Sequence, residues 1–192
     1  MHRLSTSFVL GYHGCDKAVA EAVLAGEAFR PSRNDYDWLG EGIYFWEVNP
    51  QRGLDFAREV KRRQPRLIVN PAVVGAVIDL GLCLDCTTQP ALEMLKTAHD
   101  SLAASVAAQK QERPINSGRW KRSLDCAVIQ HLHTICEAEN QTINTVRGVF
   151  VEGEEAYPGA GFRTKTHTQI TVRNLACIKG VFRVPAGQLR TR

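Results

Sequence analysis

Three side chains suited to ligand binding lie within or directly after short, strand-like segments: His13, Tyr44 and Gln169. Histidine and glutamine can each donate or accept a hydrogen bond, and the ring of a tyrosine can stack on a planar ligand. A serine or cysteine nucleophile paired with a base is not evident in the sequence. The three residue types therefore indicate a binding cleft for a ligand that carries hydroxyl groups and a flat ring.

The segment 38–47 places Tyr44 in an unusual setting. Gly40 and Gly42 permit positive φ angles or a close approach of two backbones. Ile43, Tyr44, Phe45 and Trp46 follow, and their β-branched and aromatic character favours a strand. We expect a strand that enters a cleft with one ring facing a ligand. The sequence has no GxSxG elbow, P-loop or GxGxxG fingerprint, which disfavours Rossmann oxidoreductase chemistry.

Helices separate the candidate strands in the first half of the chain. Tyr44 follows His13 by 31 residues, and the interval holds an amphipathic stretch with Asp16 as N-cap and Gly26 as terminator, which predicts a helix over 16–25. Asn49 and the following proline predict a second helix over 50–63. The nearly continuous apolar run 72–80 is typical of a central strand covered on both faces.

The second half of the chain begins with helices and ends with strands. Apolar side chains recur with helical spacing from Pro90 to about Gln111 and again from Ser123. Strand patterns return over 146–151, 167–173 and 178–184. We therefore expect a single α+β domain whose helical part, about 85–140, is an insertion beside the sheet.

Composition limits the class of protein. The chain has 192 residues, of which 44% are hydrophobic and 23% charged, as is usual for one globular domain. No apolar run reaches the roughly 20 residues that span a bilayer, and the N-terminus lacks the apolar region of a signal peptide. We expect a cytoplasmic protein without a membrane partner.

Basic residues cluster at 61–63, 119–122 and 190–192, and the formal net charge is +4. Such clusters attract nucleic acid or the pyrophosphate of a dinucleotide, although each one is more often solvated surface charge.

Six cysteines in such a chain favour reduced thiols over a disulfide framework. Cys83 and Cys86 form a CxxC pair, and His131, His133 and Cys136 lie close together in a later segment. A zinc site is therefore an alternative. The apolar surroundings of Cys83 and Cys86 favour buried thiols, so we expect no metal.

The sequence resembles the H-Y-E class of ADP-ribosyltransferases, which includes the poly(ADP-ribose) polymerases and the diphtheria-type toxins. The resemblance rests on Tyr12-His13-Gly14, on Gly40-Glu41-Gly42-Ile43-Tyr44-Phe45 and on the late segment from Gln169 to Ile178. It covers roughly residues 8–80 and 146–184, and the helical middle has no counterpart. The implied fold is a split antiparallel β-sheet with NAD bound as substrate.

The resemblance also implies roles for single residues. His13 would hydrogen-bond a ribose hydroxyl of NAD, and the backbone of Gly14 would hold the nicotinamide carboxamide. Tyr44 would stack on the nicotinamide ring, and Phe56 would be a second stacking aromatic, although a core position is the stronger alternative for Phe56. Gln169 stands where the class has its catalytic glutamate, so this sequence departs from the pattern at that position.

Two loops are expected to border the site. The segment 30–38 would cover the adenosine half of NAD, with Arg33 at the pyrophosphate because a guanidinium offers paired donors. The segment 152–161 precedes Gln169 where related transferases recognise the acceptor. Its candidate acceptor residues are Glu154, Glu155 and Tyr157, with a solvated acidic turn as the equal alternative.

The implied activity is NAD-dependent transfer of a single ADP-ribose to a protein or nucleic acid, as in a bacterial toxin or defence effector with a possible antitoxin. The alternative is an NAD or ADP-ribose binding module that turns over slowly or not at all. An enzyme acting on RNA is a third possibility, motivated by the basic clusters.

Overall fold

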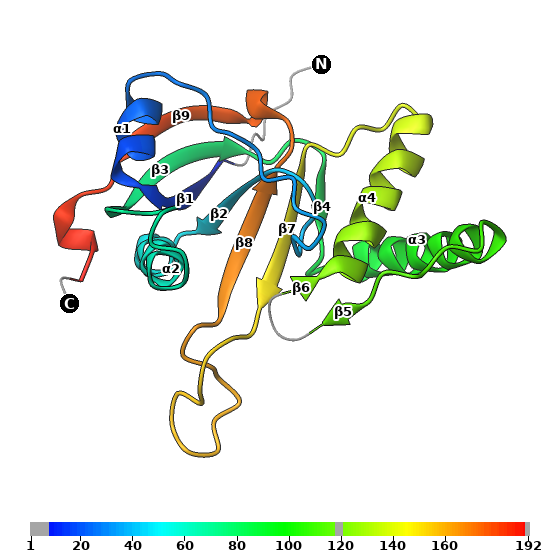
Figure 1. The fold of residues 1–192 in the computed structure, drawn as a ribbon. Helices are drawn as coiled ribbons and strands as arrows, with labels where there is room; N and C mark the ends of the chain where they lie inside the picture. Colours follow the sequence, from blue (N-terminus) through cyan, green and yellow to red (C-terminus); the bar gives the residue numbers. More distant parts are fainter. Residues whose placement is uncertain (1–7, 118–120, 191–192) are drawn as a thin grey trace.

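The computed structural model describes residues 8–117 and 121–190 of the chain, so the basic segments 119–122 and 190–192 lie partly outside the described residues. A seven-stranded sheet with the order β4-β7-β8-β2-β1-β3-β9 forms its centre (Figure 1). The strands are β1 (Phe8–Asp16), β2 (Ile43–Glu47), β3 (Pro71–Asp79), β4 (Cys83–Asp85), β7 (Thr145–Phe150), β8 (His167–Val172) and β9 (Ile178–Arg183). The helices are α1 (Lys17–Leu24), α2 (Pro50–Arg63), α3 (Gln89–Ala108) and α4 (Ser123–Ala138), with the short strands β5 (Asn116–Ser117) and β6 (Lys121–Arg122) between α3 and α4. The expected α+β class is confirmed.

One pair of strands departs from the expected antiparallel arrangement. β4 runs parallel to β7, whereas the other neighbouring strands of the seven-stranded sheet are antiparallel. A parallel pair needs a long crossover connection, and α3 and α4 supply it. The helical middle of the chain is thus the link that brings β7 back beside β4, at the right of the sheet in Figure 1.

Two hydrophobic cores lie on opposite faces of the sheet. One face carries Phe45 and Val74 and packs against Ala20 and Val23 of α1. The other face carries Val146 and packs against α4, and α2 lies on this same face farther along the sheet, where its Gly53 approaches Trp46. Because α2 and α4 cover different parts of one face, the sheet surface between them is left for a site.

The local signals for helix ends are confirmed. The side chain of Asp16 accepts a hydrogen bond from the amide of Ala18 at the start of α1, and Gly26 ends that helix region with a φ of 106°. Asn49 caps α2 by accepting a hydrogen bond from the amide of Arg52, and α2 has the bounds predicted from the sequence.

β1 and β2 pair over only two positions before they separate. Gly11 lies opposite Glu47 and Tyr12 opposite Trp46, and β2 continues instead along β8. Gly42, just before β2, has a φ of 150°, and a Cβ there would lie 2.5 Å from a methyl group of Thr171. A side chain at Gly42 would therefore push β2 away from β8 and alter the gap beside β1.

His133 on α4 is a buried histidine without a hydrogen-bond partner among the described residues: its side chain is 2% exposed. Burial, assisted by nearby Arg173, lowers the pKa of His133 to about 4. A folded pKa below the unfolded value means that the neutral ring contributes stability above about pH 6.5, which is lost as the pH falls toward 4.

We expect His133→Leu to remove this acid sensitivity. Wild type should lose about 2 kcal/mol of unfolding free energy at pH 5 because of His133, and the leucine variant should lose correspondingly less. Urea unfolding at pH 7 and pH 5 measures the difference, with His131→Leu, at a partly exposed position of the same helix, as control. Equal pH dependence in wild type and His133→Leu would show that this ring is not neutral and buried.

Among the described residues, none of the helices combines the length and the apolar character needed to cross a membrane. The six cysteines are free thiols, and four of them, including Cys126 and Cys177, are buried.

Candidate functional site

A cavity of about 540 Å³ opens on the sheet face between α2 and the 30–38 segment. Its volume lies in the range of small-ligand sites. The residues that line it include His13, Arg30, Tyr44, Trp46, Arg52, Phe56, Phe150, Glu152 and Gln169. The structure therefore brings together His13, Tyr44, Phe56 and Gln169, four of the residues predicted from the sequence, and the 30–38 segment borders the cavity as expected.

His13 fills the gap where β1 and β2 part. Its Nδ1 lies 2.9 Å from the carbonyl oxygen of Tyr44, and a carbonyl only accepts, so Nδ1 carries the proton. Burial lowers the pKa of His13, and the neutral ring leaves Nε2 as an acceptor. The rings of Phe29 and Phe45 pack against the His13 ring, with centroid distances of 5.3 and 5.7 Å. His13 can thus accept a hydrogen bond from a ligand hydroxyl.

Tyr44 is fixed by its hydroxyl group and offers its ring to the cavity. The hydroxyl donates to the carbonyl of Gly40 at 2.7 Å and accepts from the amide of Leu39 at 3.0 Å. Burial raises the pKa of Tyr44 far above its usual value, so the hydroxyl stays protonated near neutral pH. The ring is therefore the part of this residue that faces the cavity, and this arrangement suits stacking rather than acid–base chemistry.

The orientation of Gln169 follows from its neighbour His167. Nδ1 of His167 donates to the carbonyl of Lys165 at 2.6 Å, which leaves Nε2 as the acceptor in the neutral ring. Burial, followed by the positive charge of Arg52, lowers the pKa of His167 and keeps the ring neutral. The amide NH₂ of Gln169 then donates to His167 Nε2 at 2.9 Å. Its carbonyl oxygen has no partner among residues 8–117 and 121–190 and remains an acceptor.

Phe56 occupies a position that fits both of its predicted roles, as a core residue and as an aromatic side chain available to a ligand. Its ring packs on Trp46 with centroids 4.7 Å apart and an interplanar angle of 40°, and it also lines the cavity. Trp46 and Gln169 lie opposite each other on β2 and β8. The aromatic wall is therefore continuous with the strand position that carries the glutamine.

A buried charge network lies at one end of the cavity and was not predicted from the sequence. Arg52 is 7% exposed, and its Nη2 lies 3.2 Å from Glu152 and 3.6 Å from Glu59. Lys165 pairs with Glu59 at 2.7 Å, and the Arg52 guanidinium lies 5.7 Å from the centre of the Trp46 ring. The positive charges of Arg52 and Lys165 therefore balance the negative charges of Glu59 and Glu152. Charged groups that are removed from water need such partners. The turn position of Glu152 in the sequence suggested a solvated residue, and no local signal marked it as buried.

Two predicted cofactor residues lie outside the cavity wall. The Arg33 side chain is 78% exposed and pairs with Glu41 at 2.7 Å, while Arg30 lines the cavity from the same segment. Gly14 faces α2, where an added Cβ would lie 2.0 Å from the carbonyl oxygen of Gly53. The absence of a side chain at Gly14 is therefore explained by helix packing, and a contact between its backbone and NAD stays a prediction.

The predicted acceptor loop projects from the end of the sheet between β7 and β8 (Figure 1). Glu154, Glu155 and Tyr157 are exposed on it, as expected for such a loop. Glu155 accepts from the amide of Gly159 and lies 3.8 Å from Arg163, so the loop has internal contacts. Within the described ranges, no group of three histidine, cysteine or acidic residues is arranged to hold a metal ion.

Comparison with known proteins gives one partial match. The chain is 33% identical over 67 residues to an uncharacterized protein of Methanocaldococcus jannaschii. The match spans 35% of this chain and only 31% of the archaeal protein. No protein-family model and no solved structure matches the chain.

Proposed function

We propose that this chain binds NAD in the cavity and transfers a single ADP-ribose group to a macromolecular acceptor, as transferases of the H-Y-E class do. The observation that carries the proposal is the convergence of His13, Tyr44 and Gln169, from β1, β2 and β8, on one cavity. The separation of β1 from β2 supports the split-sheet transferase core within the α+β fold.

The side chains supply complementary contacts for the nicotinamide half of NAD. The Nε2 atom of His13 accepts from a ribose hydroxyl, and the ring of Tyr44 stacks on nicotinamide. The free carbonyl of Gln169 accepts from the 2′-hydroxyl of the same ribose. Arg30, which lines the cavity, replaces Arg33 as the candidate for the pyrophosphate.

The reaction breaks the bond between the nicotinamide nitrogen and C1′ of the ribose. Nicotinamide leaves with the electron pair, and a lone pair of the acceptor forms the new bond to C1′ while the acceptor loses a proton. The transition state carries positive charge on the ribose, as in glycoside hydrolysis. Gln169 offers a dipole but no charge, so we expect one transfer to an already nucleophilic acceptor and no polymer.

A binding module without turnover is the second candidate. The glutamine at position 169 favours it, because the catalytic glutamate of the class is absent. Either role is compatible with a bacterial toxin or defence effector, and a toxin would call for an antitoxin partner.

We expect His13→Ala and Tyr44→Ala each to weaken NAD binding at least tenfold, since each removes a positioned contact. Titration calorimetry with NAD measures the loss, and thermal unfolding checks that both variants fold. His131→Ala is the matched control, because His131 lies on α4 and bonds Ser101 outside the cavity. Undetectable binding of NAD to wild type, or equal binding in all four proteins, would overturn the assignment.

A further inference from the structure

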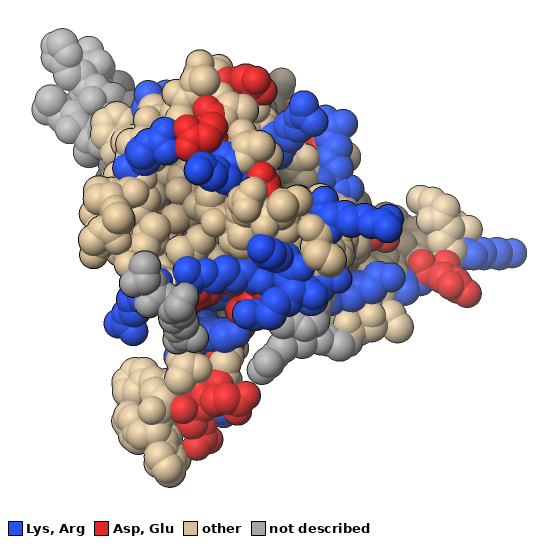
Figure 2. All heavy atoms as spheres, turned by 60° about the vertical axis from the view of Figure 1, so that its left-hand side comes forward, with Lys and Arg blue, Asp and Glu red and all other residues tan. Residues whose placement is uncertain are grey.

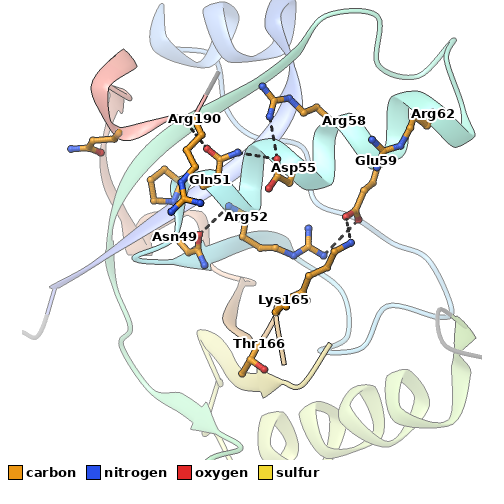
Figure 3. A pocket seen from close by; sticks show the side chains of 13 residues that line it. Asn49, Gln51, Arg52, Asp55, Arg58, Glu59, Arg62, Lys165, Thr166 and Arg190 are labelled. Atoms are coloured by element: carbon orange, nitrogen blue, oxygen red, sulfur yellow. Dashed lines mark hydrogen bonds and ion pairs between the residues drawn. The ribbon is translucent and has the colours of Figure 1, made fainter. Parts of the chain in front are cut away.

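A second cavity, of about 690 Å³, lies beside α2 and is built mainly from charged side chains (Figure 3). It is bordered by α2, by residues 164–166 at the base of the projecting loop and by residues 188–190 near the C-terminus. Five cationic residues line it: Arg52, Arg58, Arg62, Lys165 and Arg190. Only two carboxylates, Asp55 and Glu59, line it as well. We call this cavity the basic hollow.

Two of the five cationic side chains in the basic hollow are not neutralised by carboxylates of the described residues. Arg52 pairs with Glu152 and Glu59, Lys165 also pairs with Glu59, and Asp55 pairs with Arg58 at 3.1 Å. The guanidinium groups of Arg62 and Arg190 have no ion pair among the described residues. The backbone amide of Arg190 donates to Gln51 at 2.7 Å and holds the C-terminal segment against α2 (Figure 3). The hollow therefore favours an anionic ligand.

Arg52 gives an independent indication of a ligand. Its side chain is 93% removed from solvent, yet Nε and Nη1 lack hydrogen-bond partners in the part of the chain that the structure describes. Buried guanidinium nitrogens are normally satisfied, and leaving them bare is costly. Among the described residues, Arg52 is also the one that the walls of the basic hollow and the 540 Å³ cavity share. An anion in the basic hollow would place a negative charge near a guanidinium group whose own hydrogen-bonding capacity is only partly used.

The loop over 151–166 carries exposed aromatic rings, and its base lines the basic hollow. Tyr157 is 58% exposed and Phe162 is 72% exposed. Lysine and arginine side chains gather across the middle of the face shown in Figure 2, and the loop forms the lobe below them. Lys165 joins the two features, since it lies at the base of the loop and lines the hollow.

We propose that the basic hollow and the 151–166 loop bind single-stranded nucleic acid, with phosphates in the hollow and bases stacked on Tyr157 and Phe162. Positive grooves flanked by aromatic rings are the usual means of binding single strands. A duplex keeps its bases stacked inside and offers no base face to these rings.

Given the proposed transfer reaction, on which this step depends, the bound strand is the acceptor. A nitrogen or oxygen of the strand supplies the lone pair that forms the bond to C1′ of the ribose and then loses its proton, while nicotinamide leaves. The shared wall at Arg52 places the strand beside the NAD cavity.

Fluorescence anisotropy with labelled 12-nucleotide DNA and RNA strands tests the inference over a range of salt concentrations. We expect the triple variant Arg58→Ala/Arg62→Ala/Arg190→Ala to bind at least tenfold more weakly. The slope of log K against log salt should fall by about 2, since each phosphate contact on a single strand contributes about 0.7. The variant Lys17→Ala/Lys96→Ala/Lys110→Ala removes the same charge elsewhere and should bind like wild type.

The double variant Tyr157→Ala/Phe162→Ala should weaken binding at least fivefold while the salt slope stays unchanged, because stacking releases no counterions. Equal losses in the two charge variants would overturn the inference. So would tighter binding to a duplex of the same length, or binding to vesicles containing phosphatidylserine without binding to either strand.

NAD calorimetry on the same proteins separates this inference from the proposed function. If the protein binds the strand but not NAD, the proposed transferase function is wrong and the nucleic-acid site is supported. If it binds NAD but neither strand, the nucleic-acid site is wrong and the NAD site is supported.

Discussion

Replacing Gln169 by glutamate is expected to accelerate NAD cleavage about 10²-fold. The glutamine already lies in the cavity, with its NH₂ held by His167 and its carbonyl free. A carboxylate there would place a negative charge beside the ribosyl cation that develops as nicotinamide leaves. A unit charge about 4 Å from a cation contributes roughly 4 kcal/mol at an effective dielectric of 20, and a single preorganised stabiliser typically changes a rate by about 10² to 10³.

His167 would also respond to this substitution. A carboxylate at position 169 favours a proton on His167 Nε2, where the wild-type ring accepts instead. The pKa of His167, which burial lowers in wild type, should therefore rise in the variant. Proton-detected NMR titration of the histidine rings would measure that rise independently of any activity.

NAD consumption should be followed over hours by chromatography of released nicotinamide. Gln169→Ala tests the glutamine itself and should be slower than wild type, while Gln141→Glu adds the same charge at an exposed position and should leave the rate unchanged. Three equal rates above background for wild type, Gln169→Glu and Gln169→Ala would place Gln169 outside the reaction. No turnover in any variant, together with NAD binding, would identify a binding module.

Gly14→Ala is expected to destabilise the fold by about 3 kcal/mol or more. The added Cβ would lie 2.0 Å from the carbonyl oxygen of Gly53 and 2.9 Å from its carbonyl carbon. Both atoms belong to the α2 backbone, which cannot move aside as a flexible side chain can. Overpacking of this kind costs about 1–3 kcal/mol and occasionally more. Urea unfolding measures the change.

Gly180→Ala provides the matched control for Gly14→Ala. Gly180 lies in β9, where an added Cβ would meet nothing within 4 Å. The unfolding free energy of the Gly180→Ala protein should therefore differ from that of wild type by about 0.5 kcal/mol or less. A Gly14→Ala protein that is as stable as wild type but binds NAD weakly would contradict the packing explanation. It would instead support a direct contact between this backbone position and the nicotinamide carboxamide.

Local features of the sequence were sufficient for the elements and for part of the site. Asp16, Asn49 and Pro50 predict where α1 and α2 begin, because capping depends on residues within one turn of the helix. The apolar patterns around His13, Tyr44 and Gln169 place them on strands, and the structure shows that these strands share one sheet. Short-range periodicity therefore determined which segments carry the candidate ligand-binding side chains.

Tertiary structure alone decided how distant segments meet. The local sequence around Glu152 predicts a polar turn, yet Glu152 is buried against Arg52, 100 residues earlier in the chain. The parallel pairing of β4 with β7 depends on the path of α3 and α4. Arg33 pairs with Glu41 at the surface, while Arg30 of the same segment lines the cavity. A local pattern records the preference of a residue for a helix, strand or turn, but not its partner across the fold. Burial and charge pairing between distant segments arise only when the whole sheet and its helices pack together.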